Sequence, residues 1–135
     1  RMPFPAACAD LALEGWSFGH LTGWHPDNWP DEVRRALAEM MRLLRPGGTA
    51  LVIETLGTGR ETPHPPTEAL AAFYALLEHE YGFASSWIRT DFCFESSQQG
   101  ADLTRFFFGD ELADGLRREN RRILPECTGL WWRAR

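Results

Sequence analysis

Apolar residues recur with helical spacing in one segment and run without interruption in the next, which predicts a helix followed closely by a buried strand. The apolar positions of this helix recur at steps of three and four residues: Val33, Leu37, Met40, Met41 and Leu44. This spacing places them on one side of a helix. Pro46, Gly47 and Gly48 then stop the helix, and residues 50–53 are all apolar. A continuous apolar strand is typical of a sheet covered by helices on both faces.

The same criteria predict the elements on either side of this joint. Residues 9–14 form a short strand that stops at Gly15, and the next helix is capped by Asn28. Residues 56–66 contain several Gly and Pro and form an exposed loop. After this loop, Thr67 caps a helix that ends at Gly82, with one apolar stripe: Leu70, Phe73, Tyr74, Leu77 and Tyr81.

The remaining third of the chain combines strands with one interrupted helix. Residues 87–95 alternate between two faces, as a strand does. Ser96 or Ser97 caps a helix to about Phe108, Gly109 interrupts it, and it restarts toward residue 123. Residues 127–133 form the last strand. The pattern therefore predicts an α/β fold with about four strands and helices on the faces of their sheet.

Composition narrows the classes of protein. The chain has 135 residues, a formal net charge of -5 and 14 basic residues that are all Arg, which argues against an extended nucleic-acid surface. No apolar run reaches the roughly 20 residues that span a membrane. The three Cys lack the spacing of a metal site, and the first residues lack the features of a secretion signal. These observations predict a soluble cytoplasmic protein of at most one domain, without a metal site.

The order of the motifs resembles one family. The joint at residues 43–48, Leu-Leu-Arg-Pro-Gly-Gly, resembles the segment before the fifth strand of class I S-adenosylmethionine-dependent methyltransferases. It is preceded by Met2-Pro3-Phe4-Pro5 and by residues 9–14, Ala-Asp-Leu-Ala-Leu-Glu, in the order that this family shows around its fourth strand. A dehydrogenase half shares the strand, loop and helix order, but these motifs make it the weaker alternative.

The resemblance covers residues 1–135 but only the carboxyl-terminal half of the family's domain. It implies a partial Rossmann-like sheet that lacks the first three strands and ends in an antiparallel strand. The family's Gly-rich turn and ribose-binding acidic residue would lie in the missing half. Because a half sheet exposes an edge and an apolar face, we expect a homo-oligomer or pairing with a separate amino-terminal half.

The resemblance also implies site residues. Glu14, Gly15, Trp16 and Ser17, at the end of the fourth strand, would lie beside S-adenosylmethionine. Met2, Pro3 and Phe4 would run near its adenine. Trp16 is equally well explained as a core aromatic residue, and Gly15 as a tight turn. The family's Asn/Asp-Pro-Pro-Tyr/Phe motif for nucleic-acid base and glutamine substrates is replaced here by Glu14-Gly15-Trp16-Ser17, which favours a small-molecule, lipid or natural-product acceptor.

Other candidates follow from residue chemistry and their place at the carboxyl ends of strands, where α/β sheets bind ligands. His20 and His25 are possible general bases, although a His hydrogen-bonded to backbone is the simpler explanation. Glu54 ends the central strand and could bind an acceptor amine or hydroxyl, or could cap a loop. We therefore take His20 and Glu54 as catalytic candidates. Trp24, His25 and Tyr74 are candidates for the acceptor pocket, although helical spacing also places Tyr74 in the core.

Two functions of different classes remain open. The first is methyl transfer from S-adenosylmethionine to a small-molecule acceptor, weak or absent until the missing half is supplied. The second is a non-catalytic half domain that acts as an oligomerisation or interaction module. Binding of cofactor by the chain would distinguish them.

Overall fold

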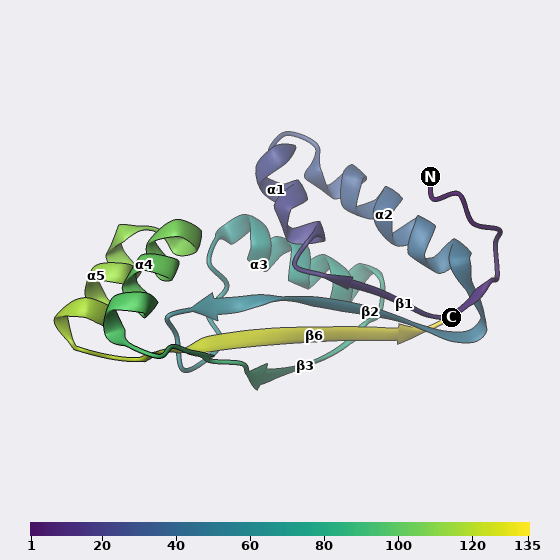
Figure 1. The fold of residues 1–135 in the computed structure, drawn as a ribbon. Helices are drawn as coiled ribbons and strands as arrows, with labels where there is room; N and C mark the ends of the chain where they lie inside the picture. Colours follow the sequence, from purple (N-terminus) through teal and green to yellow (C-terminus); the bar gives the residue numbers. More distant parts are fainter. The chain divides into compact units, whose positions relative to one another are not determined.

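Four strands form the main sheet in the computed structural model, which describes residues 1–135. They are β1 (Ala9–Gly15), β2 (Leu44–Thr58), β6 (Glu126–Ala134) and β3 (Ala84–Arg89), in the spatial order β1, β2, β6, β3. β1 and β2 pair in parallel, whereas β6 runs in the opposite direction to β2 (Figure 1). The predicted α/β class and the antiparallel last strand are thus confirmed. β1 and β3 are the two edge strands of this sheet.

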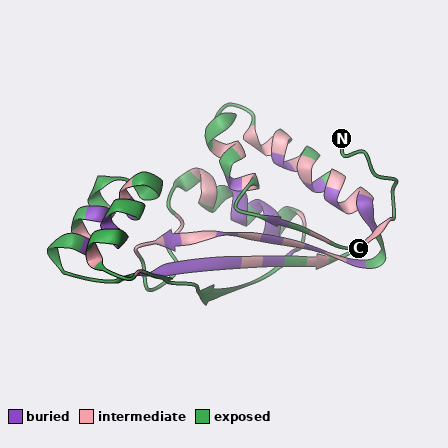
Figure 2. Ribbon diagram, viewed as in Figure 1, coloured by how far each residue is buried: buried purple, intermediate pink, exposed green.

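The chain divides into two compact units. The first comprises Arg1–Glu54, Pro65–Ser86 and Gly129–Arg135, and the second comprises Thr55–His64 and Trp87–Thr128. The strands β2, β3 and β6 each contribute residues to both. These strands differ in how far their residues are buried: most of β6 is buried, whereas β3 is exposed throughout (Figure 2).

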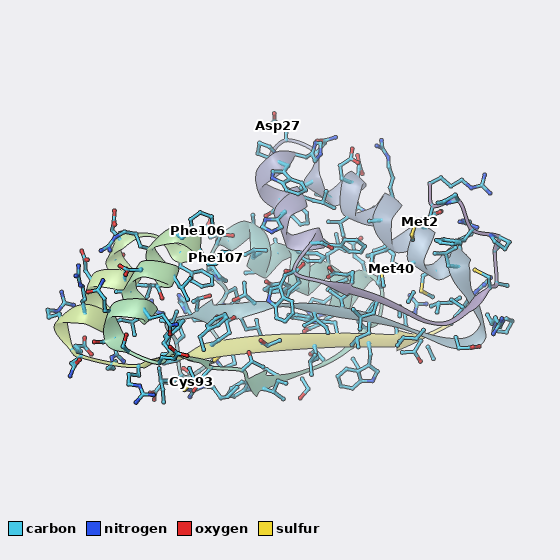
Figure 3. The ribbon with its side chains drawn as sticks, in the orientation of Figure 1. Met2, Asp27, Met40, Cys93, Phe106 and Phe107 are labelled. Carbon is cyan, nitrogen blue, oxygen red and sulfur yellow. The ribbon has the colours of Figure 1, made fainter.

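Four helical segments belong to the first unit: η1 (Phe18–His20), α1 (Leu21–Trp24), α2 (Trp29–Leu43) and α3 (Glu68–Ala75), the last continuing as a π-helical turn, η2 (Leu76–Glu80). The predicted stripe of α2 is buried at Val33, Leu37 and Met40. Met40 lies on the inner side of α2 (Figure 3). The core of this unit also contains the stacked rings of Tyr74 and Trp131, whose centroids lie 4.5 Å apart.

The joint between α2 and β2 forms as predicted, but without an intervening loop. α2 ends at Leu43, and the extended strand begins at Leu44 and continues through Pro46. Gly47 has φ of 81°, which a residue with a side chain rarely adopts. The chain therefore changes from helix to extended strand between Leu43 and Leu44, and Gly47 adopts its unusual backbone angle within the first residues of that strand.

The second unit contains a short antiparallel pair of strands and two helices. β4 (Phe92–Cys93) pairs in antiparallel fashion with β5 (Ile123–Leu124), and α4 (Ser97–Phe108) and α5 (Asp110–Arg118) lie between them in the chain. The break at Gly109, where φ is 88°, confirms the predicted interruption. Ser96 accepts a hydrogen bond from the N–H of Gln99 at 3.1 Å, which confirms it as the cap of α4.

Three predicted boundaries were wrong. The strand predicted at residues 87–95 is β3, which starts at Ala84, and the separate β4, because an exposed edge strand has no buried face to mark its position. β2 extends to Thr58 into the predicted loop. α5 ends at Arg118 rather than near Ile123. Asn28 precedes α2, but its side chain donates to Glu32 instead of capping the backbone.

Candidate functional site

Glu14 and Glu54 lie on the same face of the sheet, near the carboxyl ends of two adjacent strands. Glu14 is opposite Val52 in the pairing of β1 with β2. Since side chains alternate along a strand, Glu54, two residues beyond Val52, projects to the same side as Glu14. Both side chains are buried, with 7% of Glu14 and 3% of Glu54 exposed. The fold thus brings two carboxyl groups together in a region that excludes most water.

The turn that follows β1 supplies hydrogen-bond donors to both carboxyl groups. The hydroxyl of Ser17 donates to Glu14 Oε2 at 2.8 Å, and the backbone N–H groups of Ser17 and Phe18 point to the same oxygen at 3.2 and 3.3 Å. The N–H of Gly19 donates to Glu54 Oε1 at 2.6 Å. The three residues after Trp16 therefore wrap around the pair. Glu14 Oε1 is buried and accepts from none of these donors.

Burial and mutual repulsion raise the pKa values of this pair of carboxyl groups. Burial and, second, the negative charge of Glu14 together raise the pKa of Glu54 to about 8, although the N–H of Gly19 opposes both effects. Burial also raises the pKa of Glu14, against the hydrogen bonds from Ser17 and Phe18. Glu14 has the larger number of donors, so it ionises first. Glu54, with its pKa of about 8, therefore still holds its proton at neutral pH.

Trp16 lies at the point where β1 ends. Its backbone has φ of 50°, which is unusual for a bulky residue, and its N–H donates to the carbonyl of Ile53 at 2.8 Å. About half of its side chain, 51%, is exposed. The alternative explanation of Trp16 as a core residue is therefore wrong. Gly15, beside it, is exposed as well.

The imidazole of His20 stacks on the ring of Trp24, with centroids 5.2 Å apart and planes inclined by 15°. Both side chains are exposed, and His20 directly follows Gly19 in the chain. His25 is also exposed and ends α1. The helical segments η1 and α1 thus hold His20, Trp24 and His25 close in sequence to the donors of the carboxyl pair.

Two sets of predicted site residues lie elsewhere in this unit. Tyr74 is buried and stacks on Trp131 in the core. Met2 lies beside the last turns of α2 (Figure 3), where its N–H donates to Glu39 at 2.8 Å and the carbonyl of Phe4 accepts from Arg42 at 3.0 Å. Met2, Pro3 and Phe4 are exposed and precede the amino end of β1, whereas the carboxyl pair lies at its other end.

Sequence reasoning missed the coupling of Glu14 to Glu54 and the role of Gly19. The coupling was accessible in principle: each Glu lies at the end of one of two predicted strands that are neighbours in a parallel sheet. The role of Gly19 could not be predicted, because it depends on how closely this residue approaches other side chains in the folded chain. A Cβ at Gly19 would lie 2.8 Å from Glu54 Oε2 and 3.0 Å from Leu70 Cδ2.

The structure shows neither a cluster of metal-binding side chains nor a helix that could span a membrane. No group of three or more His, Cys, Asp or Glu side chains is arranged to hold a metal ion. None of the helices has the length and apolar character that crossing a membrane requires.

Comparisons with known proteins point to one family. Residues 1–52 match the family model of the methyltransferase domain. The resemblance predicted from the sequence is confirmed over this segment, which contains β1, α2 and most of the buried part of β2. No curated protein sequence matches the chain significantly.

Several solved structures align with the chain at low identity. A protein of Bacillus halodurans described as a methyltransferase is 14% identical, with a TM-score of 0.48, over 99% of this chain and 67% of its own. The cyclase SpnF is 18% identical, with a TM-score of 0.49, over 100% of this chain and 53% of its own. The protein MccD is 15% identical, with a TM-score of 0.47, over 98% and 64%. The chain thus spans about half to two thirds of these structures, and at such identities they say nothing about its activity.

Proposed function

We propose that this chain, whose residues 1–52 match the methyltransferase domain family, is part of an enzyme that transfers a methyl group from S-adenosylmethionine to a small-molecule acceptor. The observation that carries the proposal is the buried pair of Glu14 and Glu54 at the carboxyl ends of two parallel strands. That edge of an α/β sheet is where ligands bind. The chain itself supplies acidic groups there and an exposed aromatic residue, Trp16.

The chemistry of Glu14 fits a cationic ligand. The carboxyl group of Glu14 is hydrogen-bonded to that of Glu54, and its buried Oε1 accepts from no backbone or Ser donor. An ammonium or hydroxyl group of a ligand that reached this oxygen would add a donor to it. The negative charge of the pair also favours a positive group nearby. S-adenosylmethionine, when bound, supplies an electrophilic methyl group on a positive sulfonium and also carries an ammonium. We assign its binding to Glu14 with Gly15, Trp16 and Ser17.

Glu54 is the better candidate for moving a proton. An acceptor N–H or O–H loses a proton when it is methylated, and a base works best when its pKa lies near the working pH. Burial and Glu14 raise the pKa of Glu54 to about 8, so most of it is protonated at neutral pH and its ionised fraction would be the base. His20 is the second candidate, and its stacking on Trp24 fixes the plane of its ring. Trp24 and His25 are exposed and available to contact the acceptor, while Tyr74 would act through the core.

The chain is proposed to need a second component. β1 is an edge strand, and its Leu11 and Leu13 are both 55% exposed. An open edge beside exposed apolar side chains favours pairing with another chain. The partner is a separate amino-terminal half, which would add the missing strands, or a second copy of this chain. We expect weak or no activity without it.

Calorimetry with S-adenosylhomocysteine tests the proposal directly. The purified chain, with its mass measured by light scattering, should bind this product with saturable heat. Glu14→Gln should weaken binding at least about tenfold, the value of one charge-assisted contact. Glu111→Gln, a change at an exposed Glu of α5, serves as the matched control and should leave binding unchanged.

A specific observation also supports the alternative function, an interaction module without catalysis: the same open edge of β1. A folded oligomer that gives no heat with S-adenosylhomocysteine would favour it and would contradict cofactor binding by this chain. Equal weakening by Glu14→Gln and Glu111→Gln would contradict the role of Glu14 while leaving the family relationship intact.

A further inference from the structure

A cavity of about 230 Å³, open to solvent on one side, lies within the second unit, and none of the residues that line it belongs to the candidate site described above. Its wall is made by six residues of β4, of the segment that follows it and of α4: Phe92, Phe94, Leu103, Thr104, Phe107 and Phe108. No polar atom contributes to the surface of this wall. The wall therefore exposes no charged or hydrogen-bonding atom to an occupant, and the one hydroxyl among its residues, Thr104 Oγ1, is buried and has no hydrogen-bond partner.

The rings that line the cavity support one another. The centroids of Phe92 and Phe94 lie 6.5 Å apart with nearly parallel planes, and those of Phe92 and Phe108 lie 5.6 Å apart. Phe94 packs directly on the backbone of α4 at Gly100, where an added Cβ would lie 2.7 Å from its Cδ2. A glycine inside a helix is unfavourable, and here it makes room for the ring. Part of the wall is thus formed by rings that pack on one another and on the backbone of α4.

Several of these apolar groups remain in contact with water. Phe107 is 68% exposed, and Leu103 and Phe108 are 45% and 42% exposed. Covering such rings with an apolar group is favourable in proportion to the area removed from water. A charged group that enters the cavity loses its water, and an apolar wall does not replace those interactions. The cavity therefore disfavours charged ligands.

The size of the cavity limits its occupant. An engineered protein cavity of about 150 Å³ with apolar walls binds benzene. A cavity of about 230 Å³ has room for one six-membered ring with a small substituent. A flat ring also suits walls of Phe, whose faces and edges interact favourably with other aromatic rings.

We propose that this Phe-lined cavity is a binding site for a small uncharged aromatic compound, or for an uncharged aromatic group of a larger ligand. The site lies wholly among residues 92–108 and does not depend on the Glu14 and Glu54 pair. It therefore goes beyond the proposed methyl transfer, and its test is independent of cofactor binding.

Fluorine NMR on the full chain tests this site with three probes of one shape: fluorobenzene, para-fluorobenzoate and para-fluorobenzylamine. Fluorobenzene should bind saturably, and the anion should bind at least about tenfold more weakly, since its charge meets only apolar groups. The cation should also bind more weakly than fluorobenzene, but less so than the anion, because the faces of Phe rings attract a positive charge. Leu103→Trp, which places a ring in the cavity, should abolish binding.

Two neighbouring residues of α4 give a matched pair of variants (Figure 3). Phe107→Ala removes a wall and should weaken fluorobenzene at least about fivefold, the range of one aromatic contact. Phe106 is 81% exposed and does not line the cavity, although its ring meets that of Phe107 edge to face at 4.9 Å, so Phe106→Ala should weaken binding clearly less than Phe107→Ala.

Three results would overturn the proposal. One is the absence of saturable binding by the folded monomer. Another is equal affinity for the neutral and charged probes, or equal effects of the two Phe variants. The third is a dimer, seen by sedimentation, that dissociates in Phe107→Ala and binds no probe, which would assign the rings to contact with a second copy.

Discussion

The backbone N–H of Gly19 donates to Glu54 Oε1 at 2.6 Å, and the same glycine leaves no room for a side chain beside Glu54 Oε2. The chain therefore approaches the buried carboxyl group with its backbone alone. This contact holds Glu54 in place and joins β2 to the turn after β1. Any side chain at position 19 must push the carboxyl group or Leu70 aside.

Gly19→Ala should destabilise the chain by roughly 1–3 kcal/mol, because a small-to-large change in a packed site forces its neighbours to move. Gly23→Ala is the control, since an added Cβ there meets nothing within 4 Å. It should be neutral or slightly stabilising, because Ala is the better helix former. Urea denaturation followed by circular dichroism measures both. Equal effects of the two variants would mean that the contact with Glu54 is loose.

Glu54 should make stability fall as the pH rises. Its pKa is about 8 in the folded chain and 4.5 in the unfolded chain, so the folded state binds the proton more tightly between these values. The contribution of Glu54 to the free energy of unfolding is then largest at the acidic end of this range and is lost as the pH rises through about 8. The slope should approach roughly 1 kcal/mol per pH unit.

Denaturation from about pH 5.5 to 8.5 measures this slope, and two substitutions test its source. Glu54→Gln should flatten it. Glu14→Gln should reduce it, because the charge of Glu14 contributes to the raised pKa of Glu54. Glu39 and Asp91 do not interfere, because salt bridges lower their pKa values and the stability they contribute is lost only at more acidic pH. A slope unchanged in Glu54→Gln would contradict the shared proton.

Local signals in the sequence predicted the fold well where they act within a few residues. Thr67 caps α3, accepting from the N–H of Leu70 at 3.1 Å. The helix-to-strand change near residue 44 was also predicted, although α2 ends at Leu43, before the predicted stop at Pro46 and Gly47. β3 was misplaced because all of its residues are exposed, so no alternation of burial marks its ends.

The candidate site was predictable only in part, for a related reason. The position of Glu54 at the end of a strand is a local property, and it was recognised. Its coupling to Glu14 depends on the register between β1 and β2, which is set by the packing of distant residues. The irregular register between Ala9 and Leu11 shows how little the sequence pattern alone fixes this alignment.

Leu13→Lys should reduce the proposed association of the chain through β1. A charged side chain on an edge strand opposes pairing with another strand. Ile88→Lys is the control, since Ile88 is 48% exposed on β3, the opposite edge of the sheet. Light scattering should show a lower mass for Leu13→Lys alone. If Ile88→Lys has the same effect, association does not depend on β1.

Gly100→Ala should destabilise the second unit, although alanine normally favours a helix. The added Cβ would lie 2.7 Å from Phe94 Cδ2, so the ring must leave its place against α4. The cost should be roughly 1–3 kcal/mol. Gly115→Ala in α5 is the matched control: an added Cβ there meets nothing within 4 Å, so the change should stabilise by up to about 1 kcal/mol. Opposite signs for the two variants, measured by thermal denaturation, would show that Gly100 is retained for the ring above it. Stabilisation by both would mean that Phe94 is free to move, and the cavity would then have no fixed wall.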